Sequence, residues 1–111
     1  MTHPILPKGV NAAIKMIIDI AEELTEIMEQ EARALMLKDQ MGFMNAQGEK
    51  TRLTNNYEQA CVEFKERAED FKVADAMLVK KLEQAQANLL KQTNDNNEVM
   101  ERLQERTGGA Q

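Results

Sequence analysis

The sequence predicts an all-α protein, either an antiparallel helical hairpin or an elongated three-helix bundle of long amphipathic helices. From Glu49 to Thr107 the chain contains no Gly and no Pro, the two residues that most often interrupt a helix. Apolar residues recur there at steps of three and four, the spacing of one helix face. They are Leu53, Tyr57, Ala60, Phe64, Ala68, Phe71, Leu78, Leu82, Ala85, Leu89, Val99 and Leu103. Such a face predicts a binding surface rather than a reaction site.

The first nine residues are expected to form a flexible N-terminal tail, because Pro4, Pro7 and Gly9 do not enter a regular element easily. A first helix is predicted over residues 10–38. Asn11 is expected to cap its free backbone amides. The apolar face of this helix consists of Ile14, Ile17, Ile18, Ala21, Leu24, Met28, Ala32 and Leu35.

A second helix is predicted over residues 40–71, after a tight reversal at Lys38 and Asp39. The Asp39 side chain is well suited to cap this helix. Gly42 and Gly48 each weaken a helix by about 1 kcal/mol relative to Ala. Their presence indicates fraying or close contact with the first helix.

A break is predicted near residues 72–75, where Asp75 can cap a third helix over 74–107, although a continuous helix is compatible with the same pattern. Polar Gln92 and Asn96 occupy positions where the heptad calls for apolar residues. We therefore expect a weak point at 94–97 and a poorly anchored segment beyond it. Residues 108–111 are expected to form a flexible tail.

Composition narrows the class of protein. The 111 residues fit one domain. The chain has 14 basic and 19 acidic residues, and the resulting net charge of -5 argues against nucleic-acid binding. The single cysteine, Cys61, fits a reducing compartment, and the apolar run in residues 10–21 is too short to span a bilayer. We expect a soluble, cytoplasmic protein without stable membrane insertion. Its eight Met residues suit either a thin core or a surface that accepts a partner's helix.

The residues needed for catalysis and for metal binding are scarce. The chain has no Ser, one Cys and a single His, His3, in the N-terminal segment. Glu22, Glu23, Glu26 and Glu29 cluster on one helix, but the carboxylate-bridged metal bundles pair Glu with His on inward faces. We therefore expect no enzyme activity, no metal and no cofactor.

The order of several motifs resembles a known family. Glu31 and Leu35 stand in the first helix, Lys38-Asp39 breaks it, and Glu49-Lys50, Leu53 and Tyr57 follow before a long C-terminal helix rich in Asn and Gln. Over residues 14–105 the chain resembles the FlgN family of flagellar export chaperones. It departs from the family in Gly42 and Gly48, and in the absence of aromatic residues from the third helix.

The resemblance implies a cytoplasmic chaperone in bacterial flagellum biogenesis. Such a protein keeps hook-associated (hook-filament junction) proteins export-competent and delivers them to the gate of the flagellar type III secretion apparatus. Its C-terminal helix would capture an amphipathic segment of the cargo, as a helix in a groove. The candidate partner-binding residues are Leu82, Leu89, Leu90, Val99, Met100 and Leu103. No residue is assigned to contact with the export gate.

Two alternatives stay open. The first is a homo-oligomeric coiled coil with a structural or adaptor role, such as a homodimer packed along Leu78, Leu82, Leu89 and Leu103. The Gln92 and Asn96 layer would then specify register. The second is a small regulator of a secretion apparatus, which only the identity of its partner would distinguish.

Overall fold

The computed structural model describes residues 3–108, with side chains through Glu105, and confirms the all-α fold class. Three long helices form an elongated bundle of 56 × 29 × 20 Å. They are α1 (Val10–Leu37), α2 (Gln40–Glu66) and α3 (Ala76–Gly108), with a short 3₁₀ helix, η1 (Asp70–Val73), before α3. The three predicted helices are therefore present, and residues 109–111 of the expected C-terminal tail lie outside the described part.

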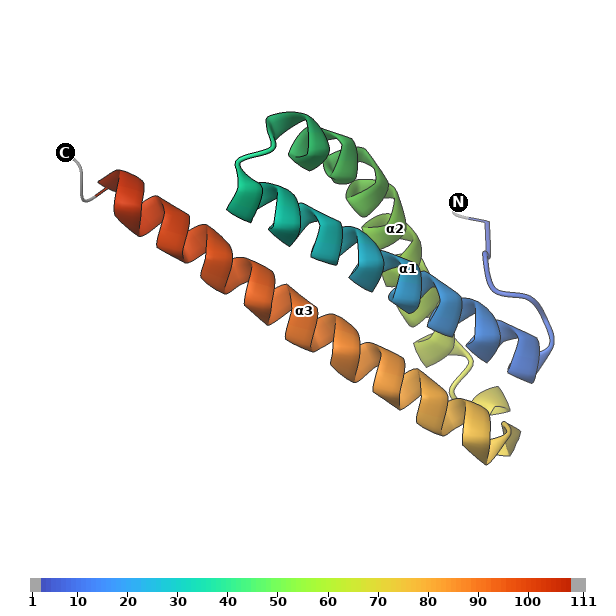
Figure 1. Ribbon diagram of the computed structural model, residues 1–111. Coiled ribbons are helices and arrows are strands. Elements are labelled where there is room, and N and C mark those ends of the chain that lie inside the picture. Colours follow the sequence, from blue (N-terminus) through green and yellow to red (C-terminus); the bar gives the residue numbers. More distant parts are fainter. Residues whose placement is uncertain (1–2, 109–111) are drawn as a thin grey trace.

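The first helix is the central element of the bundle. α1 packs against both α2 and α3, whereas α2 and α3 have little contact with each other (Figure 1). α2 runs antiparallel to α1, and α3 runs parallel to it. Because α1 is covered from two sides, Ala13, Ile20 and Ala34 are buried in addition to most of the predicted apolar stripe. The predicted stripe was thus too narrow for a helix with two neighbours.

The turn between α1 and α2 follows the prediction for Asp39. Asp39 Oδ1 accepts a hydrogen bond of 3.0 Å from the Gly42 N–H, which caps α2. A side chain at Gly42 would collide with the Asp39 carboxylate, so the close contact of this glycine is with its own cap and not with α1. Gly48 has open space around it, and α2 continues through both glycines.

The break between the second and third helices begins earlier than predicted. α2 ends at Glu66 rather than at residue 71, and α3 starts at Ala76. Phe71, in η1, folds back so that its ring stacks on Phe64 with 4.5 Å between centroids, and the Arg67 guanidinium lies 5.1 Å from the Phe71 ring centroid. Burial of Phe71 by this turn explains why the chain leaves the helix without a Gly or a Pro.

The cap predicted for the first helix is absent, and Asn11 has another role. Gly9 occupies the N-cap position and makes no side-chain cap. Asn11 Oδ1 instead accepts a hydrogen bond of 3.1 Å from the Asp75 N–H, while Asp75 Oδ1 caps α3 by accepting from the Met77 N–H at 2.8 Å. Asn11 therefore ties the start of α3 to the start of α1 (Figure 1 shows both at the lower right).

The N-terminal segment is not a free tail over its described residues. Leu6 is buried in the core, and the N–H groups of Ile5 and Leu6 each donate a 2.9 Å hydrogen bond to the carboxylate of Glu63. Burial raises the pKa of Glu63, but these bonds and others to the carboxylate outweigh it and the pKa is lowered. The Arg67 guanidinium donates hydrogen bonds of 2.8 Å to the carbonyls of Pro7 and Lys8. Hydrogen bonds thus hold the segment before α1 against α2.

Candidate partner-binding site

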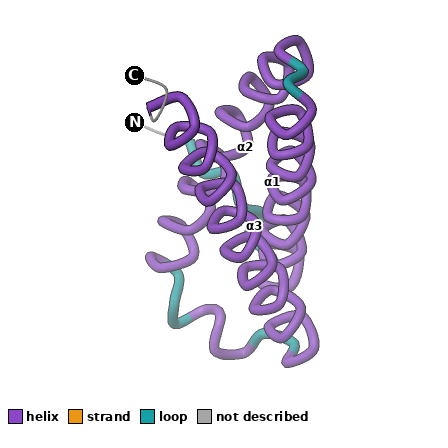
Figure 2. The backbone as a smooth tube through the Cα atoms, turned by 60° about the vertical axis from the view of Figure 1, so that its left-hand side comes forward, coloured by secondary structure: helices purple, strands orange, loops and turns teal. Residues whose placement is uncertain are grey.

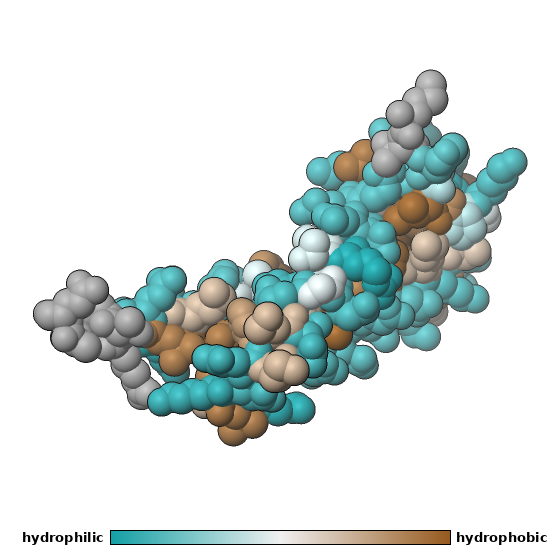
Figure 3. Space-filling model, turned by 90° about the horizontal axis from the view of Figure 1, so that it is seen from above, coloured by the Kyte–Doolittle hydropathy of each residue, from teal (hydrophilic) through white to brown (hydrophobic). Residues whose placement is uncertain are grey.

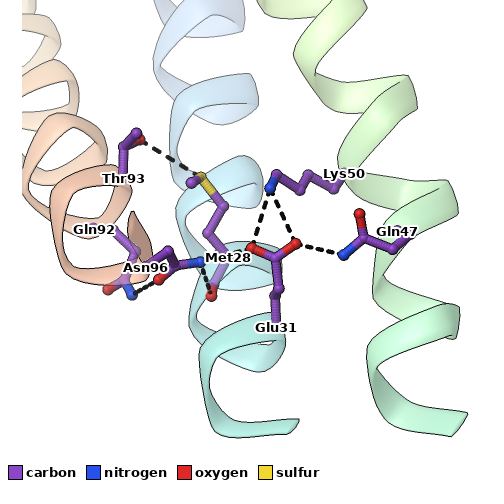
Figure 4. A network of polar contacts seen from close by, with 7 residues as sticks. All are labelled: Met28, Glu31, Gln47, Lys50, Gln92, Thr93 and Asn96. Atoms are coloured by element: carbon purple, nitrogen blue, oxygen red, sulfur yellow. Dashed lines mark hydrogen bonds and ion pairs between the residues drawn. The ribbon is translucent and has the colours of Figure 1, made fainter. Parts of the chain in front are cut away.

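A buried polar node joins the three helices toward the C-terminal end of α1. The carboxylate of Glu31, a residue only 1% exposed, accepts hydrogen bonds from Gln47 and Lys50 of α2 and from Asn96 of α3 (Figure 4). The Lys50 Nζ to Glu31 Oε2 distance is 3.0 Å. Burial raises the pKa of Glu31, but the three donors and the Lys50 charge outweigh it, so the pKa is lowered. The node keeps a carboxylate charged inside the bundle.

Asn96 is the contribution of α3 to this node. Its side chain, 2% exposed as a residue, donates 2.8 Å hydrogen bonds to the Met28 carbonyl and to Glu31 Oε1, and accepts one from Gln92 (Figure 4). α3 is not interrupted at residues 94–97, where a weak point was predicted, and Asn96 is hydrogen-bonded to α1 there. The polar layer anchors α3 to α1 within one chain, as a buried polar residue sets register in a coiled coil.

Beyond the node, α3 extends past the end of its neighbour. Thr93 contacts Met28 and Asn96 contacts Glu31, each pair 65 positions apart, so the last residue of α1, Leu37, lies level with Arg102. α3 continues to Gly108. The two helices also diverge toward this end (Figure 1, Figure 2). Among the described residues, no other helix therefore lies beside α3 beyond Arg102.

A groove of about 220 Å³ lies where these two helix ends diverge, and we call it the distal groove. Its lining residues are Leu35, Met36 and Lys38 from the end of α1, and Val99, Arg102 and Leu103 from α3. Val99 and Leu103 are half-buried in it. The distal groove is thus an apolar hollow built from segments far apart in the sequence.

A second hollow, of about 310 Å³, lies on the other side of Leu35, under the α1–α2 turn. Its lining residues are Ala34, Leu35, Lys38, Asp39, Gln40, Phe43 and Met44. Around it, Met36, Leu37, Met41 and Met44 are each about 70% exposed. Figure 3 shows apolar side chains reaching the surface toward the end that carries the C-terminus. We call these four residues with Phe43 the methionine tip.

The structure divides the six candidate partner-binding residues. Leu82 and Leu89 are buried in the core, so they are not accessible to a partner. Val99 and Leu103 line the distal groove, and Met100 is 38% exposed beside them. Leu90 is 63% exposed and does not line the groove. The six residues therefore do not form one continuous face.

Sequence reasoning missed the contribution of α1 and of the α1–α2 turn to this end of the molecule. Leu35 was expected only as a core position, and Lys38 and Asp39 only as a helix break. The available signal was the crowding of Met36, Leu37, Met41, Phe43 and Met44 around that break. Apolar residues that cluster in this way can form an exposed patch, and such patches mark interaction sites.

The described residues offer little for other kinds of site. Among them, no group of three or more His, Cys, Asp or Glu side chains is placed to hold a metal ion, and Glu22, Glu23, Glu26 and Glu29 are all exposed. No helix in the described part is long and apolar enough to cross a membrane. Comparison of the chain with protein-family models, curated proteins and solved structures gave no significant match.

Proposed function

We propose that this protein is a helix-binding chaperone of the flagellar export type, which holds an amphipathic segment of a hook-associated protein in the distal groove. The observation that carries the proposal is the apolar surface beyond the Glu31–Asn96 node. There α3 presents Val99 and Leu103 toward the end of α1, with no third helix over them among the described residues. A cargo helix would complete the bundle at this end.

The flagellar part of the proposal rests on the sequence resemblance. Residues on which the resemblance depends have structural roles that suit such a chaperone: Glu31 and Lys50 pair in the node, Lys38-Asp39 forms the turn, and Leu53 is buried. Leu35 and Lys38, which also belong to the resemblance, line the distal groove. A cytoplasmic location and delivery to the type III export gate are part of the same proposal.

The coiled-coil alternative receives less support. A homodimer along the α3 stripe would use Leu82 and Leu89, which already pack inside one chain. Asn96, which would set the register of a dimer, is bonded to Met28 and Glu31 of its own chain. A partner that binds in the distal groove would leave these contacts within the chain intact.

The test is a calorimetric titration of the purified chain with the hook-associated proteins of its own genome, run beside sedimentation of the free chain. Saturable binding of one cargo per monomer supports the proposal. Leu103→Asp should weaken binding at least tenfold, because burial of a Leu side chain contributes about 1.5–3 kcal/mol. Circular dichroism should show that its helicity is retained.

Leu90→Asp is the matched control, since it places the same charge on an exposed position of α3 outside the groove. It should leave cargo binding unchanged. Equal loss in both variants would refute the groove as the cargo site. No binding by the wild-type chain, together with a stable dimer in sedimentation, would favour the coiled-coil alternative.

A further inference from the structure

The distal groove carries a charge that differs from the charge of the whole chain. The protein has a net charge of -5, yet the charged residues that line this groove within the described part are Lys38 and Arg102, both cationic. No ion pair involves either side chain among the described residues. Two cations without a carboxylate partner at the rim of an apolar groove are available to a bound molecule.

Carboxylates lie close to both cations in sequence, but none forms an ion pair with them among the described residues. Glu98, Glu101 and Glu105 surround Arg102 on α3, yet none lines the groove. Asp39 follows Lys38 directly, but it accepts the Gly42 N–H and caps α2. On the next surface along α1, which shares Met36 with the groove, Arg33 and Glu29 are both present and balance each other in charge. Within the lining of the distal groove, the charged side chains are therefore the unpaired cations Lys38 and Arg102.

The backbone of Lys38 supplies an independent observation. Lys38 ends α1 in the left-handed conformation, with φ 56° and ψ 34°, and it is the one non-glycine residue with positive φ in the described chain. Gly is the usual residue at such a helix end because it has no side chain to strain. A residue that carries a side chain is strained in this conformation. Here the side chain lines the groove.

We propose that the distal groove selects an amphipathic helix whose apolar stripe is flanked by carboxylates, and that Lys38 and Arg102 read those carboxylates. The proposal rests on the proposed function for its groove and adds the chemistry of the occupant. Apolar anchors would fill the space between Leu35 and Leu103, and acidic residues would meet the two cations at the rim. Rim charges of this kind govern which partner binds more than how tightly it binds.

The test uses two synthetic helical peptides that share leucines at i, i+4 and i+7 and differ only in their flanking residues, Glu in one and Lys in the other. Their affinities for the full chain are measured by fluorescence anisotropy at low salt. The Glu peptide should bind about tenfold more tightly, because each exposed ion pair changes affinity by about two- to fivefold. High salt should reduce the difference.

Charge reversal in the protein separates this role from a structural one. Arg102→Glu should weaken binding of the Glu peptide and strengthen binding of the Lys peptide. A merely structural change would weaken binding of both. Lys91→Glu, at an exposed position of α3 outside the groove, is the matched control and should change neither. Lys38→Gln provides a second variant that removes charge without reversing it.

The outcomes distinguish the two proposals. Equal affinities of the two peptides, or no binding of either, would overturn the charge selection even if hook-associated proteins still bind through Leu103. A tenfold preference for the Glu peptide that Arg102→Glu inverts would support it. Failure of the hook-associated proteins to bind would overturn the proposed function. A preference for the Glu peptide would then still support charge selection, with a different acidic helix as the partner.

Discussion

Asn96 and Glu31 lie 65 positions apart in the chain, and Asn96 Nδ2 donates a hydrogen bond of 2.8 Å to Glu31 Oε1. The carboxylate also accepts hydrogen bonds from Lys50 and Gln47 of α2. One side chain of α1 is therefore bonded to both neighbouring helices. Because α2 and α3 have little direct contact, this node is the main polar link that holds the three helices in one register.

Asn96→Asp should strongly destabilise the bundle. The substitution places a second carboxylate against the buried Glu31 and removes the two hydrogen bonds that the Asn96 amide donates. We expect a loss of about 3 kcal/mol in the free energy of unfolding, measured by urea denaturation. Asn88→Asp is the control, since Asn88 is exposed and only accepts a bond from Gln84. Equal losses in both variants would mean that the node contributes no special stability.

Acid should weaken the fold through Glu31 and Glu63. Although burial raises the pKa of each, their hydrogen bonds lower both below the ordinary value of 4.5. The unfolded chain therefore binds protons first as the pH falls. The stability that these carboxylates contribute is present above about pH 4.5 and is lost as the pH falls through the folded-state pKa values.

Urea midpoints between neutral and acidic pH measure this loss. Glu63→Gln should lower stability at neutral pH and should make the remaining dependence on pH shallower. The Glu49 carboxylate, which pairs with Arg52 on the surface, is the comparison. Glu49→Gln should leave the pH dependence almost unchanged, because solvent screens an exposed pair. A wild-type stability that is flat through this range would contradict the assignment.

Leu6→Ala should test the docked N-terminal segment. Leu6 is 7% exposed and belongs to the core, so its truncation should cost about 2 kcal/mol, seen as a lower melting temperature. Pro4→Ala, at an exposed neighbour, should have little effect. A melting temperature unchanged by Leu6→Ala would show that the segment is not held on the bundle in solution.

Gly48→Ala should stabilise the protein by about 1 kcal/mol, since the site is exposed, helical and surrounded by open space. Gly42→Ala is the informative comparison. Its new methyl group would collide with the Asp39 carboxylate and disturb the cap of α2, so the gain in helix propensity should be offset. Thermal unfolding of both variants measures the contrast, and equal gains would mean that the Asp39 cap contributes little.

Local signals in the sequence predicted the elements well. The periodic apolar residues and the absence of Gly and Pro identified the helices, and Asp39 identified the start of α2 because capping is a local interaction. Asn11 and the end of α2 were predicted wrongly, since both depend on packing between distant segments. Asn11 is bonded to Asp75, and Phe71 is buried by folding back on Phe64.

The candidate site was predicted only in part for the same reason. Val99 and Leu103 line the distal groove, but Leu82 and Leu89, which lie on the same helical stripe, are buried by α1. Periodicity identifies an apolar face of a helix without showing where along its length that face is covered. The point along α3 at which α1 stops covering this face depends on the offset of the two helices and on where their ends diverge.

The sequence by itself determined that this protein is all-α, with long amphipathic helices and a turn at Lys38-Asp39, because helix propensity, periodicity and capping act over a few residues. It left open whether the chain breaks again near residues 72–75. The tertiary structure alone decided that α1 is central, that Asn96 and Glu31 meet inside the bundle, and that the ends of α1 and α3 diverge to form the distal groove. These features depend on side chains about 65 residues apart, whose meeting is set by the packing of whole helices.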